Sequence, residues 1–220
     1  MIGVADLINS LAAVKSLVYD HHLVTMDELT RALASDFVGY DEIKELCERA
    51  PKYGNDDEAV DDIANEIFTF IADEIENYQS KFGKMTPGIL PVSGNTPFGL
   101  VVGALPSGRK AWTPLADGVS PSGGTDTNGP SSVIKSVSHI PHDRFVQGTL
   151  LNMKVEPDLL KDESGIAQMM ALLKSVCSLG LFHVQFNVID REVLLKAQAQ
   201  PEAYKGLLVR VAGYTAYFVE

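Results

Sequence analysis

The chain of 220 residues is predicted to have an α/β fold in which a helical N-terminal segment precedes alternating helices and strands. Apolar side chains recur at helical spacing through residues 1–80, which predicts helices. Residues 81–130 are rich in glycine and proline and are predicted to hold loops with short strands. Residues 131–220 alternate apolar strands with amphipathic helices, the pattern of an α/β unit. We therefore expect three consecutive segments.

The N-terminal segment is predicted to be a series of helices. Helical periodicity covers residues 4–18, 41–49 and 56–78. A further helix should begin after Thr25 and run to residue 34, because Thr25 and Glu28 have the hydroxyl-and-carboxylate spacing of a capping box. The face of the long helix that we expect to be buried carries Val60, Ile63, Ile67, Phe70, Ile71, Ile75 and Tyr78.

The glycine- and proline-rich middle is predicted to be an ordered loop region with short strands at residues 89–93 and 100–105. It has few charges, and long ordered loops are usually functional. Residues 107–110, Ser-Gly-Arg-Lys, lack the spacing of a phosphate-binding P-loop. The apolar side chains that we expect to be buried here are Phe98, Leu100, Val101, Val102, Leu105, Trp112 and Leu115.

The last third is predicted to alternate helix and strand. Gly180 is expected to end one helix and Asp190 to cap the next. The expected elements are a helix at 130–138, a strand at 149–154, a helix at 164–179, a strand at 182–189, a helix from 190 to about 198, a strand at 207–211, and a final helix that begins after Gly213 or at Thr215.

Charge and composition narrow the class of protein. The formal net charge is −11 and the pI is about 4.8, which argues against nucleic-acid binding through phosphate neutralisation. No apolar run is long enough for a membrane span, and the N-terminus lacks a signal-peptide pattern, so we expect a cytoplasmic location. Residues 1–80 have a net charge of −13, which fits either solvated acidic helices or an acidic docking surface.

Cysteines and histidines give no sign of a metal site. Cys47 and Cys177 lie in no metal-ligand spacing, and both are expected to be small buried apolar side chains. The adjacent pair His21 and His22 is expected to be solvated, because neighbouring residues on a helix point about 100° apart.

Four stretches of the chain resemble the glycyl radical enzymes. Arg210–Phe218, RVAGYTAYF, is similar to their glycyl radical motif, and the resemblance extends over residues 182–214. Residues 103–140 and the run APKYGNDD at 50–57 are further matches. The resemblance is greatest to the pyruvate formate-lyase-like branch, which includes glycerol and diol dehydratases, hydroxyproline dehydratase and choline lyase.

The resemblance implies that Gly213 stores a backbone radical. A glycine Cα can become planar, since it carries no Cβ, and Val211, Tyr214 and Phe218 are expected to shield it. A separate radical-SAM activase would install the radical, with no bound cofactor in this chain. The resemblance also implies the C-terminal part of an α/β barrel, a small-molecule substrate and a homodimer of the full-length protein.

The family passes its radical to a cysteine in a Gly-Cys-x-Glu pattern, and neither Cys47 nor Cys177 matches that pattern. The catalytic cysteine is therefore expected before Met1, with the rest of the radical domain after Glu220. Two alternatives are a stand-alone spare radical subunit without its own catalysis and an acidic interaction module with a coincidental motif. By resemblance, residues 93–99 form either part of a pocket wall or a structural loop.

Overall fold

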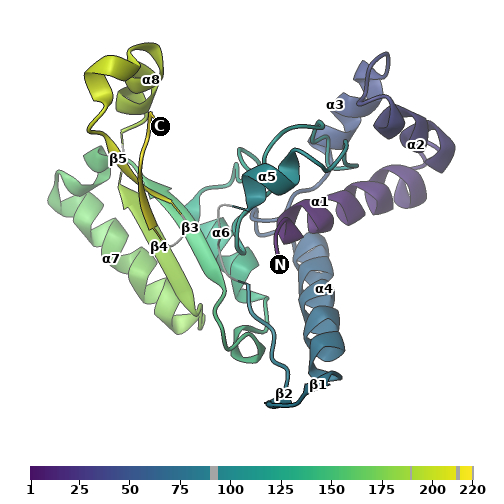
Figure 1. The fold of residues 1–220 in the computed structure, drawn as a ribbon, viewed down its shortest axis with the longest axis horizontal. Coiled ribbons are helices and arrows are strands. Elements are labelled where there is room, and N and C mark those ends of the chain that lie inside the picture. The colour runs from purple at the N-terminus through teal and green to yellow at the C-terminus, as the bar shows by residue number, and fades with distance from the viewer. Residues whose placement is uncertain (90–93, 189, 212–213, 220) are drawn as a thin grey trace.

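A computed structural model describes residues 1–89, 94–188, 190–211 and 214–219 (Figure 1). The N-terminal segment is helical, as predicted, and its second helix begins with the predicted capping box. The Thr25 hydroxyl accepts a hydrogen bond from the Glu28 amide at 3.2 Å, and the Glu28 carboxylate accepts one from the Thr25 amide at 2.9 Å. The helices are α1 (Val4–Val14), continued by a π-helical stretch (Lys15–Asp20), α2 (Met26–Ala34), α3 (Asp41–Arg49) and α4 (Glu58–Glu76).

The buried stripe of α4 differs from the predicted one. Phe68 is fully buried and packs edge-to-face on Phe145, with ring centroids 5.6 Å apart. Phe70 and Tyr78 are mostly exposed, against the prediction. The reason is geometric, because Phe70 follows Phe68 by two residues and so points to the opposite side of the helix. The stripe that enters the core is Val60, Ala64, Phe68 and Ala72.

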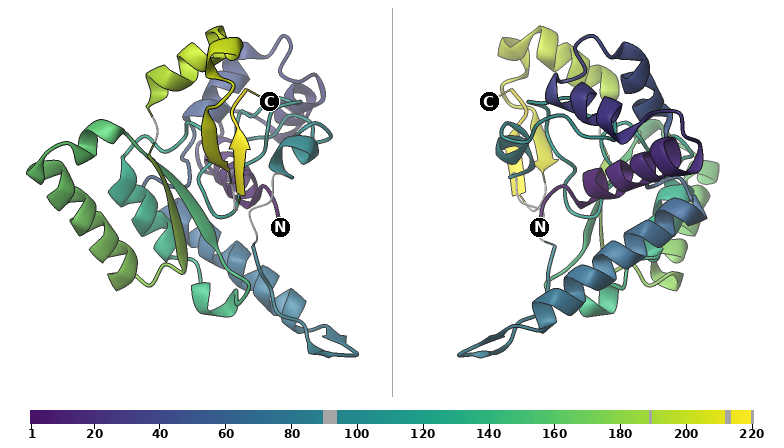
Figure 2. Two further views of the ribbon diagram at one scale, coloured as in Figure 1. Left: turned by 60° about the vertical axis from the view of Figure 1, so that its left-hand side comes forward. Right: turned by 90° about the vertical axis from the view of Figure 1, so that its right-hand side faces the viewer.

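A short hairpin of β1 (Gln79–Ser80) and β2 (Gly83–Lys84) follows α4 and projects from the molecule (Figures 1 and 2). Ile89 is buried and forms an isolated parallel bridge with Thr149, at the start of the strand predicted over 89–93. Residues 90–93 lie outside the described residues.

The strand predicted over 100–105 is wrong. Helix α5 (Asn95–Gly99) ends there, and an irregular loop follows. The guanidinium of Arg109 organises this loop by donating to the carbonyl oxygens of Gly99 at 2.9 Å, Gly103 at 2.9 Å and Val102 at 3.3 Å. Polar contacts of Arg109 thus replace the apolar core expected here. The side chains that were predicted to be buried but are exposed are Phe98, Leu100, Val101 and Trp112.

The last third follows the predicted order up to its end. The helix expected after residue 213 is wrong, because β6 pairs antiparallel with β5, with Val211 opposite Tyr214 and Leu208 opposite Tyr217. Pairing with β5 gives the backbone of this aromatic segment partners that a terminal helical turn would lack. The elements are α6 (Pro130–Ser138), β3 (Leu150–Val155), α7 (Glu163–Ser178), β4 (His183–Val188), α8 (Arg191–Ala199), β5 (Leu208–Val211) and β6 (Tyr214–Tyr217).

Strands β3 and β4 form a parallel pair, and α6 and α7 cover one of its faces. The β5–β6 hairpin lies on the side of this pair away from α7 (Figure 2). A loop, residues 117–120, lies along the free edge of β3, where the Val119 amide donates to the Leu150 carbonyl at 3.0 Å. Gly118 permits this approach, because its φ is +51° and a Cβ there would lie 2.3 Å from the Leu150 oxygen.

The described residues thus form a mixed helix-and-strand unit with three two-stranded sheets and no closed barrel. One core cluster joins α1 and α4 to α6, β3 and β4, and a second joins α1 to α2 and α3. None of the helices in the described part of the chain combines the length and the hydrophobicity that a membrane span requires.

Candidate functional site

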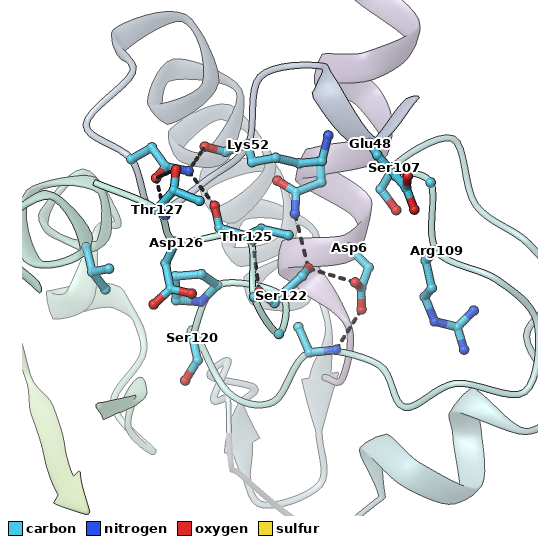
Figure 3. Close-up of a pocket in the computed structure, with 18 of the residues that line it drawn as sticks. Asp6, Glu48, Lys52, Ser107, Arg109, Ser120, Ser122, Thr125, Asp126 and Thr127 are labelled. Carbon is cyan, nitrogen blue, oxygen red and sulfur yellow. Dashed lines mark hydrogen bonds between the residues drawn. The ribbon is translucent and has the colours of Figure 1, made fainter. Parts of the chain in front are cut away.

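A cleft of about 1700 Å³ opens among the described residues (Figure 3). Its wall is built by α1, the end of α3, the loop at 50–57, the loop at 107–130 and strand β3. The cleft therefore lies where the helical N-terminal segment meets the last third of the chain.

Two side chains on one turn of α1 hold the loop on the far side of the cleft. The Asp6 carboxylate accepts hydrogen bonds from the Ala116 amide and from the Ser122 hydroxyl, both at 2.7 Å. Asn9 donates to the same hydroxyl at 3.1 Å and accepts from the Tyr53 amide at 2.8 Å. Figure 3 shows Asp6 and Ser122 directed toward one another.

Asn55, from the run APKYGNDD, performs the same task for the next part of the loop. Its amide nitrogen donates to the carbonyl oxygens of Thr125 at 2.8 Å and Lys52 at 3.1 Å. Its oxygen accepts from the amides of Thr127 at 2.8 Å and Asn128 at 3.1 Å. One half-buried amide side chain therefore fixes the backbone path of residues 125–128, as an internal substitute for a strand ladder.

Lys52 and Cys47 are buried neighbours, and both have shifted pKa values. Burial lowers the pKa of Lys52 to about 8 and raises the pKa of Cys47 to about 11. The Lys52 ammonium donates to the carbonyls of Cys47 and Ala50, both at 2.7 Å. These carbonyls lie at the C-terminal end of α3, so Lys52 acts as a C-terminal cap, and the Cys47 thiol stays protonated at neutral pH.

A second buried polar cluster joins α4 to α6. The Asp61 carboxylate accepts from the Ser136 hydroxyl at 3.0 Å, and that hydroxyl accepts from the Asp56 amide at 2.9 Å. Burial raises the pKa of Asp61, and its Oδ1 has no hydrogen-bond partner among the described residues. Burial also raises the pKa of the nearby Tyr53, whose hydroxyl donates to the Val119 carbonyl at 3.2 Å.

The residue predicted to store the radical, Gly213, lies outside the described residues. The nearest described residues on either side of it in the chain, Val211 and Tyr214, are paired across the β5–β6 hairpin. Phe218 is half-buried, and its amide donates to the Leu207 carbonyl at 2.9 Å. Of the predicted pocket segment 93–99, Asn95 lines the cleft.

The two cysteines have different surroundings. Cys47 is fully buried, which confirms the prediction for that residue. Cys177 is exposed, which corrects the prediction. The preceding residue, Val176, packs on the core, and Cys177 points about 100° further round α7, away from that core.

Metal binding finds no support in the part of the chain that the structure describes. No group of three or more His, Cys, Asp and Glu side chains is arranged there to hold a metal ion. His21 and His22 are both exposed and contact carbonyls of the preceding helical turn.

Comparison with known proteins places the chain in a family. A glycine radical family model matches residues 115–219, and a pyruvate formate lyase-like model matches residues 1–99. The chain belongs to the glycyl radical enzymes, in their pyruvate formate-lyase-like branch.

Its relatives are much longer. Isethionate sulfite-lyase from Bilophila wadsworthia is 41% identical over 99% of this chain and 27% of its own length. Trans-4-hydroxy-L-proline dehydratase from Clostridioides difficile is 40% identical over 99% of this chain and 28% of its own length. The solved structure of the glycerol-bound, B12-independent glycerol dehydratase from Clostridium butyricum matches with a TM-score of 0.92 and 45% identity, over 99% of this chain and 28% of that one. The chain thus spans about 27% of the length of the curated relatives it matches.

Proposed function

We propose that this chain is part of a glycyl radical lyase or dehydratase and that Gly213 stores its radical. The observation that carries the proposal is the match of the glycine radical family model to residues 115–219, which include the RVAGY motif at 210–214. The pairing of Val211 with Tyr214 supports it, because two further residues of the motif region are held together in a β-ladder.

The chemistry is a transfer of hydrogen atoms. A radical-SAM activase removes one hydrogen atom from the Gly213 Cα and leaves an unpaired electron there. A cysteine thiol outside this chain then gives its hydrogen atom to that carbon and becomes a thiyl radical, which attacks the substrate. The full-length protein completes an α/β barrel around the site, acts as a homodimer and is cytoplasmic.

The substrate that we propose is a small molecule bearing a hydroxyl group. Isethionate, trans-4-hydroxy-L-proline and glycerol, which appear in the names of three relatives, all carry one. The bond that is broken differs among these relatives, so the hydroxyl group is the feature that we transfer to this chain.

A spare radical subunit is the alternative to a segment of a complete enzyme. The match of the pyruvate formate lyase-like model to residues 1–99 favours the enzyme segment, because a replacement radical domain needs only the region around the motif. We keep the division into a helical segment at 1–80, a loop region at 81–130 and a radical domain at 131–220 as part of this proposal.

The test is electron paramagnetic resonance on the full-length protein after anaerobic activation. We expect a glycyl doublet, and Gly213→Ala should abolish it because a Cβ hinders both abstraction of the hydrogen and planarity of the radical. Gly206→Ala is a matched control, since a Cβ there meets no atom within 4 Å. A doublet that persists in Gly213→Ala would refute the assignment.

A further inference from the structure

The parallel pair β3–β4 has two chemically different faces. On one, Leu151 and Met153 pair in register with Val184 and Phe186 and pack against the core beneath α6 and α7. The other face carries polar side chains, in register pairs of Asn152 with Gln185 and Lys154 with Asn187. We call these four residues the polar wall.

Parallel sheets in proteins are normally covered on both faces. A covering helix would require apolar side chains, and the polar wall offers three amides and an ammonium instead. Asn152, Lys154 and Asn187 all line the large cleft. The β5–β6 hairpin lies on this same side of the sheet, away from α7 (Figure 2).

Part of the hydrogen-bonding capacity of the wall is unused. The Asn152 amide nitrogen donates to the Asp117 carboxylate at 2.6 Å, which leaves its oxygen as an acceptor. That oxygen is buried and has no partner among the described residues. Lys154 is exposed, and no described carboxylate forms an ion pair with it. Among the described residues, the Asn152 oxygen and the Lys154 ammonium of the wall are therefore without a hydrogen-bond or ion-pair partner.

We propose that the polar wall binds the substrate of the parent enzyme and that this substrate is a small hydroxylated anion, a carboxylate or a sulfonate. Its hydroxyl group donates to the Asn152 oxygen, and its acidic group accepts from the Lys154 ammonium. Residues two apart on a strand are about 6.6 Å apart, a span that a molecule of a few carbon atoms covers with a hydrogen bond at each end. This inference rests on the proposed function, since the rest of the enzyme must enclose the wall.

The experiment is calorimetric titration of isethionate and of glycerol into the unactivated full-length protein, which requires no radical. Lys154→Met should weaken isethionate binding by about tenfold or more and change glycerol binding by less than about twofold, because only the anion loses an ionic hydrogen bond. Lys154→Arg should retain most of the affinity for isethionate. Lys174→Met, which removes an exposed lysine on α7, is the matched control and should bind both ligands normally.

Three results would overturn the inference: wild-type protein that binds glycerol but not isethionate, wild-type protein that binds neither, or Lys154→Met that binds isethionate as well as wild type does. Loss of the radical signal is a separate outcome. A protein that binds isethionate through Lys154 yet gives no glycyl doublet would contradict the proposed function and leave the binding site standing.

Discussion

The Asp6 carboxylate and the Ser122 hydroxyl are joined by a hydrogen bond of 2.7 Å across 116 residues of sequence. The same carboxylate accepts from the Ala116 amide, so one side chain on the first helix fixes both ends of residues 116–122. These residues lie in the region matched by the glycine radical model, whereas Asp6 lies in the region matched by the pyruvate formate lyase-like model. Asp6 therefore ties the two matched regions together beside the cleft.

Asp6→Ala should lower the stability of the protein by about 1–3 kcal/mol, because it leaves a buried backbone amide and a hydroxyl without their acceptor. Urea denaturation followed by circular dichroism measures the change. Asp62→Ala removes an exposed carboxylate on α4 and should have little effect. Equal unfolding midpoints for Asp6→Ala and wild type would show that the hydrogen bonds of Asp6 contribute nothing to stability.

Gly118→Ala tests the close approach of the loop to β3. The added Cβ would lie 2.3 Å from the Leu150 oxygen, and the residue has a φ of +51°. Backbone strain and the steric clash together should lower the free energy of unfolding by about 2 kcal/mol or more. They should also separate the loop from the strand. Gly123→Ala in the same loop is the matched control, because a Cβ there meets no atom within 4 Å. The measurement is hydrogen exchange at the Val119 amide, which should become faster only in Gly118→Ala.

Local signals made most of the elements predictable. Thr25 caps α2, and Asp190 caps α8 by accepting a hydrogen bond from the Glu192 amide at 2.7 Å. The N-terminal residue that caps each of these two helices lies next to it in the sequence. The segment after Leu100 could not be predicted in this way. Its path depends on one guanidinium, that of Arg109, and apolar composition alone suggested a strand.

The site was less predictable than the elements. The RVAGY motif indicated the family directly, and the role of Gly213 stays a prediction. Asp6 and Asn9 gave only a weak signal, as polar residues within an apolar helical pattern, because Ser122 lies more than 100 residues away in sequence. The strand β6 was not predicted for a similar reason. Its extended conformation depends on pairing with β5, which the local sequence pattern of residues 214–217 does not report.

The buried carboxylate of Asp61 should give stability a dependence on pH that an asparagine removes. Burial raises its pKa above the ordinary value of 3.8, and the hydrogen bond from Ser136 opposes that shift only in part. An acid whose pKa is higher in the folded protein contributes stability below its unfolded pKa and loses that contribution as pH rises through the folded pKa. Wild type should therefore lose stability relative to Asp61→Asn as pH rises above the unfolded pKa and through the higher folded pKa.

The amide of Asp61→Asn reproduces the protonated acid, with an oxygen to accept from Ser136 and a donor in place of the unpartnered Oδ1. Urea midpoints of both proteins at several pH values measure the difference, which should be smallest at the acid end. Asp62→Asn, one residue along α4 and exposed, is the control for replacing a carboxylate on this helix. A difference between Asp61→Asn and wild type that stayed constant with pH would mean that Asp61 ionises as readily in the folded chain as in the unfolded one.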